Sequence, residues 1–509
     1  MKGPHNIWRL IVTGATFART GALGAVLHAF DAPPLLRTVA NVVSWTFAPI
    51  GLKGDPELPP VTRAITALGP AYIKFGQILS TRPDVVGEEF SEQLTYLQDK
   101  LPPFPTAVAR RTIEEELEIS VDEEFSEFSD AVAAASIAQV HRARVRATGQ
   151  EVAVKVLRPN IERAFRTDLD AFHFFAQVIE FLLPGTRRLR PSNVIAHFES
   201  VVTAELDMRL ECASASEFYE NTRNDKGFVV PEVKWGLSSR RVMTLDWGEG
   251  ISANEMARLR ASGLDLPALG NRVLQLFLSH ALRDGFFHGD MHQGNLKFAA
   301  NGDIIALDFG IMGRIDEYTR RVYAEILYGF IRRDYRRVAE VHFEAGYIPA
   351  DQDVEAFAQA LRAVGEPIFG MDASRISMGR LLHYLFEVTE WFGMQTRTEL
   401  IHLQRTMVVV EGVSRSLNPQ INIWDIAHPV VEDYIKTSIG PRAMTKDLAR
   451  TARVLSRFGP RLPGLVEDLL IAQARQPEQR SRHRPLRALS YFGLGVLSTS
   501  VLFWLIALI

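Results

Sequence analysis

An α+β fold with two lobes is the fold class that the sequence predicts, and three stretches predict it. A β-rich segment comes first and carries Lys155. A short loop further along contains Asp290, and Asn295 follows it at the fifth position. An apolar strand at 304–307 then leads directly into Asp308. The sequence therefore has a lysine on a strand first, then an acid and an amide in one loop, and last a second acid after a strand. This order predicts a first lobe that carries the lysine and a second lobe that carries the two acids.

These residue types in this order are typical of kinase-like proteins. Asp290, in His288-Gly289-Asp290, is predicted to be the catalytic-loop acid that orients or deprotonates an attacking hydroxyl. Asn295 and Asp308, the latter in Asp308-Phe309-Gly310, are predicted to be Mg²⁺ ligands on a nucleotide's phosphates, because Mg²⁺ prefers hard oxygen donors. Lys155 is predicted to hold the α- and β-phosphates of ATP. The same loop pattern also fits small-molecule phosphotransferases, and Asp or Asn alone commonly cap turns.

Composition limits the class of protein further. The 509 residues exceed one ordinary hydrophobic core, and 47% apolar with 23% charged residues indicates a folded chain. A net charge of −3 gives no reason to expect nucleic acid as a partner. The single cysteine, Cys212, excludes an internal disulfide framework and a cysteine-based zinc site.

We expect six parts along the chain. The first 60 residues contain apolar runs that are interrupted by charged residues. We expect this segment to form helices packed on the body of the protein, and the alternative is an amphipathic segment that lies on a membrane. The parts are an N-terminal helical or membrane-peripheral segment at 1–60, a helical extension at 61–118, a first lobe with inserted helices at 119–250, a helix-rich second lobe at 251–455, a basic linker at 456–487 and a transmembrane anchor at 488–509.

The helical extension contains an amphipathic helix that starts near Pro70. Its apolar positions recur at helical spacing, and Lys74 and Gln77 lie close together on its polar edge. From the residues alone this edge is a solvated helix surface. The proline-rich stretch at 102–105 marks a local boundary after it.

The first lobe is predicted to begin with a strand, a turn at Gly149 and a second strand at 152–156. Its first loop is alanine-rich, where such a lobe normally has a glycine-rich loop. Strands are also expected at 229–233 and 241–247, closing this lobe. Residues 192–221 are predicted to form one long helix that carries three acids. On such a helix Asp207 and Glu211 share a face, whereas Glu205 points elsewhere.

The C-terminal stretch predicts a membrane anchor. Residues 488–509 contain no charge and, as a helix, would span roughly 33 Å, enough for the hydrocarbon core. Tyr491 and Trp504 lie near its two ends, as interfacial aromatic residues do. Several arginines precede it, from Arg480 to Arg487, and predict that the body of the protein is cytoplasmic.

Two further stretches carry a resemblance to a known family. Lys74-Phe75-Gly76-Gln77 and Ala133-Ala134-Ala135-Ser136, together with the motifs above, resemble the UbiB family of atypical kinase-like proteins, also called the aarF-domain family. The resemblance argues against a small-molecule phosphotransferase. It implies that nucleotide is bound by Ala133, Ala134, Ala135, Ser136, Val140 and a Lys155–Glu211 ion pair. It also implies a regulatory extension formed by Lys74, Gly76 and Gln77 and held by acids at Glu205 and Asp207.

The resemblance also implies a function. Members are tied to ubiquinone biosynthesis and are thought to use ATP in handling polyprenyl-phenol precursors at the bacterial inner membrane. We therefore expect a membrane-anchored, Mg-ATP-dependent phosphotransferase or ATPase whose partners are ATP, membrane lipid or such a precursor, and the biosynthetic enzymes. A nucleotide-gated scaffold with little turnover is the alternative. The chain departs from the family pattern at Gln293, usually proline, and in showing one membrane span where two are common.

Overall fold

The computed structural model places most of the chain. It describes residues 3–29, 38, 48–80, 94, 102–182, 190–369, 378–394 and 398–438. The chain divides into two units, Met1–Lys436 and Thr437–Ile509. The predicted basic linker at 456–487 and the predicted transmembrane anchor at 488–509 lie outside the described residues. Among the helices that are described, none is both long enough and apolar enough to cross a bilayer.

Short helices form the N-terminal part: α1 (Gly3–Thr20), α2 (Ala22–Ala29), η1 (Ala48–Ile50), α4 (Pro60–Leu68) and α5 (Pro70–Ser80). Helix α1 contacts α4 and α10 (Ile161–Leu182). Arg9 forms an ion pair of 2.5 Å with the buried Asp168 of α10, and Thr13 shares a hydrogen bond of 2.6 Å with Tyr72 of α5. Polar contacts therefore join α1 to α10 and to α5.

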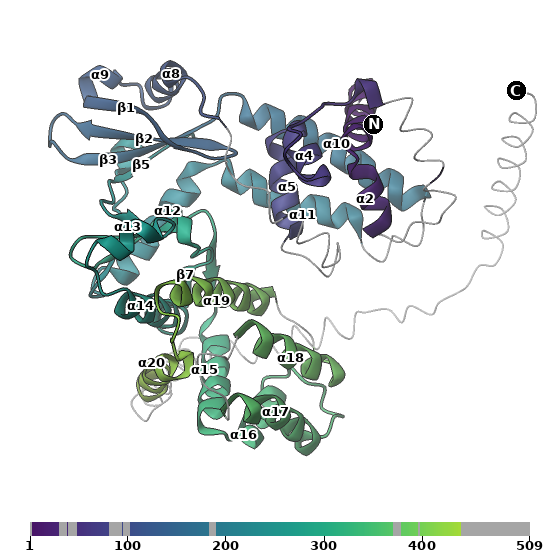
Figure 1. Cartoon of the computed structure of the whole chain (residues 1–509), viewed down its shortest axis with the longest axis vertical. Helices are drawn as coiled ribbons and strands as arrows, with labels where there is room; N and C mark the ends of the chain where they lie inside the picture. Colours follow the sequence, from purple (N-terminus) through teal and green to yellow (C-terminus); the bar gives the residue numbers. More distant parts are fainter. Residues whose placement is uncertain are drawn as a thin grey trace, which may run out of the picture. The chain divides into compact units, whose positions relative to one another are not determined.

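An antiparallel sheet forms the first lobe, in the order β1-β2-β3-β5. Its strands are β1 (Phe125–Ala134), β2 (Ala138–Val145), β3 (Glu151–Leu157) and β5 (Val242–Asp246), and α8 (Thr106–Leu117) and α9 (Val121–Glu124) lie along it (Figure 1). Burial alternates along β3, so Val154 and Val156 pack in one cluster with Ile113 of α8. Lys155 consequently projects from the opposite face.

The expected long helix at 192–221 is wrong, because the chain breaks at Leu206 and Asp207. Helix α11 (Pro191–Glu205) ends there and α12 (Met208–Thr222) begins. Asp207 is extended, with φ −120° and ψ 94°, and its carboxylate accepts the backbone N–H of Arg209 as an N-cap. The N–H of Met208 donates to the carbonyl of Arg240 instead of continuing a helix.

The second lobe contains a small sheet in the order β4-β9-β8-β6 and a separate pair β7–β10. The expected strand at 229–233 is corrected here: β4 is only Phe228–Val229, and it pairs parallel with β9 of this sheet. The other elements are β6 (Ile251–Ser252), α13 (Met256–Ala261), α14 (Leu266–Ser279), η4 (His280–Asp284), β7 (Phe286–His288), η5 (Gln293–Asn295), β8 (Leu296–Phe298), β9 (Ile304–Ala306) and β10 (Met312–Arg314).

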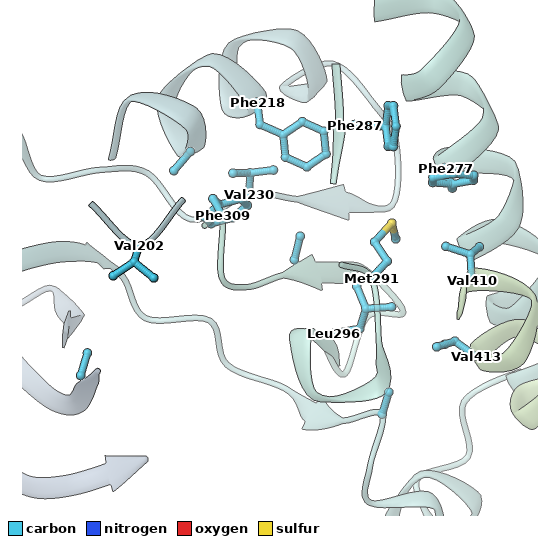
Figure 2. Close-up of a cluster of buried hydrophobic side chains, with 14 of the residues drawn as sticks. Val202, Phe218, Val230, Phe277, Phe287, Met291, Leu296, Phe309, Val410 and Val413 are labelled. Atoms are coloured by element: carbon cyan, nitrogen blue, oxygen red, sulfur yellow. The ribbon is translucent and has the colours of Figure 1, made fainter. Parts of the chain in front are cut away.

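Helices complete this unit: α15 (Glu317–Arg332), α16 (Tyr335–Glu344), α17 (Val354–Phe369), α18 (Met378–Trp391), α19 (Thr398–Leu417) and α20 (Ile423–Ser438). Helix α19 packs on α14, and Gly270 permits the close approach, since a Cβ there would lie 2.7 Å from the Ser414 carbonyl. Val410 and Val413 of α19 join a buried cluster with Phe277 and Met291 (Figure 2). The apolar floor of the Asp290 loop is therefore partly built by α19.

Candidate active site

Three predicted site residues meet where the sheet lysine reaches the second lobe. Lys155 Nζ lies 2.7 and 2.9 Å from the two carboxylate oxygens of Glu211, in the first turn of α12. The same nitrogen lies 3.5 Å from Asp308 Oδ2. The side chains of Lys155 and Glu211 are 19% and 11% exposed, whereas Asp308 keeps 51% of its side chain accessible. A desolvated ion pair therefore stands beside a carboxylate that is open to a ligand.

The three charges shift one another's proton affinities. Burial opposes the charged form of Lys155, but Asp308 and Glu211 outweigh it and raise the pKa of this lysine. Lys155 lowers the pKa of Asp308 to about 2, against the effect of burial. Burial raises the pKa of Glu211 and Lys155 opposes that rise. With two short contacts to an ammonium group, Glu211 is a carboxylate, so the cluster carries a lysine cation between two anions.

His288 connects the Asp290 loop to the strand end that carries Asp308. Its Nδ1 lies 3.1 Å from the backbone nitrogen of Asp290, and its Nε2 lies 2.9 Å from the carbonyl oxygen of Leu307. Because the Asp290 N–H can only donate, Nδ1 accepts, and Nε2 carries the proton that is donated to Leu307. Burial lowers the pKa of His288, which keeps the ring neutral as this arrangement requires.

Backbone and side-chain hydrogen bonds bring Asn295 into the same group. Asn295 Nδ2 donates to the Asp290 carbonyl at 3.0 Å, and the Leu307 N–H donates to the Asn295 carbonyl at 2.8 Å. The Asp290 carboxylate is 41% exposed, with His292 Nε2 at 3.7 Å. The loop therefore keeps its acid accessible while its backbone is fixed from two sides.

The donor set of Asn295 and Asp308 fits Mg²⁺. The amide nitrogen of Asn295 is committed to Asp290, which leaves its oxygen for a ligand. Asp308 has a left-handed backbone with φ 59°, and its Oδ1 accepts the Gly310 N–H at 3.1 Å while Oδ2 faces Lys155. Within the described residues no three His, Cys, Asp or Glu side chains cluster as metal ligands, but Mg²⁺ needs only one or two protein donors when phosphates and water supply the rest.

The alanine-rich stretch is a tight turn. Ala133 and Ala134 end β1, and Ser136, between the strands, is buried. The Ala135 N–H donates to the Ala138 carbonyl, and the Ala135 carbonyl accepts two hydrogen bonds from Arg158 at 2.9 and 3.0 Å. Val140 pairs with Lys155 across β2 and β3, so the two side chains share a face of the sheet. The N–H of Ala135 is therefore committed within the turn and is not free for a ligand.

The K-x-G-Q helix reaches the same region through one ion pair. Lys74 Nζ of α5 lies 2.9 Å from Glu205 Oε1, at the last residue of α11, and both side chains are largely buried. Gly76 is buried and Gln77 is half-buried in the same helix. Lys74 also contributes, after Lys155, to lowering the pKa of Asp308. Asp207 is not brought to Lys74 by any ion pair that the structure describes; it binds Arg209 at 2.6 Å instead.

Three residues near the loop had no predicted role. The sequence signal for His288 is its place in the His-Gly-Asp motif, two residues before Asp290. Thr406 of α19 donates its hydroxyl to the Gly289 carbonyl at 2.9 Å, across 117 positions of sequence. Arg405 is its neighbour on the same helix. No local pattern marks either α19 residue, because their relation to the loop exists only after folding.

Comparisons with known proteins agree with this geometry. Residues 96–342 match the model of the ABC1 atypical kinase-like domain, and residues 361–422 match that of the UbiB helical domain. A solved structure of Rv3197 from Mycobacterium tuberculosis with erythromycin is similar, with 26% identity and a TM-score of 0.50 over 70% of this chain and 90% of that chain. The chain therefore belongs to the UbiB family of atypical kinase-like proteins.

Proposed function

We propose that this protein binds Mg-ATP at the Lys155 cluster and acts as an ATP-dependent phosphotransferase or ATPase. One observation carries the proposal: Lys155 contacts both Glu211 and Asp308, while His288 connects the Asp290 loop to the strand end before Asp308. A fixed cation, an accessible carboxylate and an accessible loop acid thus face one region. Catalysis of phosphoryl transfer needs chiefly such positioning and charge stabilisation.

Each side chain has a definite task in this proposal. Lys155, oriented by Glu211, binds phosphate oxygens of the nucleotide. Asn295 and Asp308 hold Mg²⁺, which would neutralise charge on the phosphates. Asp290 orients the hydroxyl or water that attacks, and His288 fixes the backbone on which Asp290 stands. The neutral state of His288 matters here because its Nδ1 must remain an acceptor.

Two features favour restrained rather than rapid turnover. The N–H of Ala135 donates to the Ala138 carbonyl within the turn, so the turn offers the phosphates fewer donors than a glycine-rich loop does. Lys74 lies within electrostatic range of Asp308, the proposed metal ligand, and is held by Glu205. Helix α5 is therefore proposed as an inhibitory extension. These features also support the second candidate, a nucleotide-gated scaffold for biosynthetic enzymes with little catalysis of its own.

Membership of the UbiB family fits a role related to ubiquinone biosynthesis. We extend this to a protein at the bacterial inner membrane with its body in the cytoplasm, anchored through 488–509, that promotes the handling of polyprenyl-phenol precursors. Membrane lipid or such a precursor is the proposed partner beside ATP. The uncharged sequence of 488–509 supports the anchor.

The test compares the full-length protein with Asp290→Asn and Asp308→Asn in detergent. Mg-nucleotide binding and ATP hydrolysis are measured with and without liposomes and a phenol that mimics the precursor. We expect Asp290→Asn to bind Mg-ATP normally and to lose hydrolysis by about 100-fold or more. Asp308→Asn should lose Mg²⁺-dependent binding itself, because it removes an anionic ligand. Asp265→Asn, at the cap of α14, serves as the matched control.

The outcomes separate the two candidates. Stimulated hydrolysis that Asp290→Asn abolishes supports the enzyme. Mg-nucleotide binding without turnover in any protein supports the scaffold. Identical Mg-ATP affinity and hydrolysis in the wild type and Asp308→Asn would contradict the assignment of the site.

A further inference from the structure

The alanine-rich turn between β1 and β2 is bound by Arg158, the residue directly after β3. Its Nε and Nη2 both donate to the Ala135 carbonyl, at 3.0 and 2.9 Å. The backbone of Arg158 is fixed as well, because its N–H donates to the Ile137 carbonyl at 2.8 Å and its carbonyl accepts Arg241 Nη2 at 3.3 Å. One anchored residue therefore bonds two peptide groups of the turn.

Phe104 and Gln139 support the guanidinium of Arg158. The Phe104 ring lies beside it, with the guanidinium Cζ 5.8 Å from the ring centroid. Gln139, which is fully buried in β2, accepts the Phe104 N–H at 2.9 Å and donates its amide to the Phe104 carbonyl at 3.2 Å. The same amide nitrogen donates to His141 Nε2 at 2.9 Å, and His141 Nδ1 then donates to the Ser129 carbonyl at 2.9 Å. The position of Phe104 is therefore set by a buried hydrogen-bond network.

These contacts lie behind the sheet, away from Lys155. Gln139 pairs with Val156 across β2 and β3, and residues paired in this way share a face of the sheet. Val156 belongs to the buried cluster behind the sheet, and Phe104 packs against that cluster. Lys155 projects from the opposite face. Phe104 therefore supports the turn from the side opposite to the proposed position of the phosphates.

The turn in this conformation is not shaped to bind phosphate. The Ala135 N–H is committed to the Ala138 carbonyl, and Ser136 is 2% exposed. Backbone anion sites form where successive N–H groups converge, which takes a left-handed residue next to a right-handed one. None of the turn residues at 134–138, all of which the structure describes, has a positive φ. The turn must therefore change conformation before successive N–H groups of its backbone can bind phosphate oxygens.

We propose that Arg158 is a positioning residue that holds this turn in a closed conformation, and that nucleotide binding releases the Ala135 carbonyl from it. The proposal rests on the proposed function, because it takes the phosphates to lie at the Lys155 cluster. Phe104 belongs to the proline-rich stretch at 102–105, which joins the helical extension to the first lobe. The contact between Phe104 and Arg158 connects that stretch to the turn, so a change in the stretch alters how firmly the turn is closed.

The closed turn lowers the affinity for nucleotide by a definite mechanism. If only a fraction of the molecules has an open turn, the apparent affinity is reduced by that fraction. The hydrogen bonds from Arg158 to Ala135 exist only in the closed conformation, so their removal raises the open fraction. Loss of the Arg158 side chain is therefore expected to strengthen nucleotide binding, whereas loss of an ordinary structural contact would weaken it.

The test measures the Mg-ATP affinity of the full-length protein in detergent by calorimetry, together with amide exchange at 133–138. Arg158→Met keeps the aliphatic stem and removes the guanidinium, and it should bind Mg-ATP about tenfold more tightly and exchange faster in the turn. Arg158→Lys should fall between, because it keeps the charge and loses the planar fork. Phe104→Leu should give about a threefold gain, since it removes only the contact with the ring. Arg111→Met, on the exposed side of α8, is the matched control.

Adenosine separates the turn from the rest of the site, because it has no phosphates. Its affinity, measured by competition with Mg-ATP, should be the same in the wild type and Arg158→Met. An equal gain for adenosine would overturn the role of the turn, as would an unchanged or reduced Mg-ATP affinity in folded Arg158→Met. A thermal melt checks folding, and if Arg158→Met does not fold, Arg158→Lys and Phe104→Leu decide the proposal by the same criteria.

Failure of the proposed function gives a different result. If neither the wild type nor any variant binds Mg-ATP, the proposed function fails, and amide exchange still decides whether Arg158 holds the turn. Faster exchange at 133–138 in Arg158→Met, with the exchange of α8 unchanged, supports the closed turn. Unchanged exchange at 133–138 overturns it.

Discussion

Two lysine–glutamate pairs of similar geometry lie in this protein and occupy different structural settings. Lys155 and Glu211 are 2.7 Å apart, and Lys74 and Glu205 are 2.9 Å apart, with all four side chains largely buried. Lys155 projects from a strand inside a hydrogen-bonded sheet and has Asp308 as a second anion. Lys74 projects from a short helix that precedes the lobe. The same chemical pair thus forms part of a rigid site in one case and fastens an extension in the other.

The difference concerns what surrounds each pair. Strand β3 is hydrogen-bonded to β2 and β5, so the backbone that carries Lys155 is held by the sheet. Helix α5 is held by side-chain packing, in which Tyr72 contacts Phe172 and Phe75 contacts Phe198 with ring centroids 4.8 and 5.0 Å apart. Packing between helices separates more readily than a strand leaves a sheet. The comparison therefore predicts one permanent pair and one releasable pair.

The largest effect is expected for Lys155→Met, which keeps the aliphatic stem and removes the charge. Glu211 would remain buried beside Asp308 without its cation, so the free energy of unfolding should fall by about 3 kcal/mol. Hydrolysis of ATP should fall by about 100-fold or more. Chemical denaturation and steady-state kinetics measure the two effects. A stable variant with wild-type Mg-ATP affinity would show that this pair has no part in the site.

A smaller and more local effect is expected for Lys74→Met. Glu205 would remain largely buried without its cation, so α5 should open locally before the rest of the protein unfolds, and amide exchange at 70–80 should rise by about tenfold. Mg-nucleotide affinity should be retained or increased, because a cation near Asp308 is removed. Hydrogen exchange by mass spectrometry and nucleotide titration measure both. Arg63→Met, on the neighbouring α4, is the control. Lower nucleotide affinity would mean that Lys74 supports the site instead of restraining it.

The spacing of motifs predicted the mixed helix-and-sheet kinase-like class because strand periodicity and the acid–amide–acid order are local signals. It placed Lys155, Asp290, Asn295 and Asp308 in regions that the fold joins, and the family resemblance added Glu211. The continuous helix across Asp207 failed for a physical reason. Helix periodicity cannot show that the Met208 N–H bonds to Arg240, a residue far along the chain. Asp207 itself, a good N-cap residue, was the one local sign of the break.

The part of the site contributed by α19 could not be predicted in the same way. Thr406 lies in a helix whose approach to the loop depends on tertiary packing, including that of Gly270 on the backbone of Ser414 and of Val410 in the buried cluster. Such contacts carry no periodic signature. They depend on the meeting of two surfaces, each of which is compatible with many partners.

The smallest effect concerns pH and His288, whose ring changes charge near neutrality in the unfolded chain. Its pKa is lowered by burial in the folded state, so below about pH 6.5 the unfolded chain binds a proton that the folded one does not. The contribution of His288 to the free energy of unfolding is therefore complete above that pH and is lost on acidification, by up to about 1.4 kcal/mol per pH unit.

His288→Gln should be less stable at neutral pH, and the pH dependence of its stability should be smaller by up to one proton. Denaturant midpoints at pH 7.5, 6.5 and 5.5 measure both slopes. Equal slopes would mean that His288 binds its proton as readily in the folded protein as in the unfolded chain, and the Asp290 N–H would then need another acceptor at acidic pH.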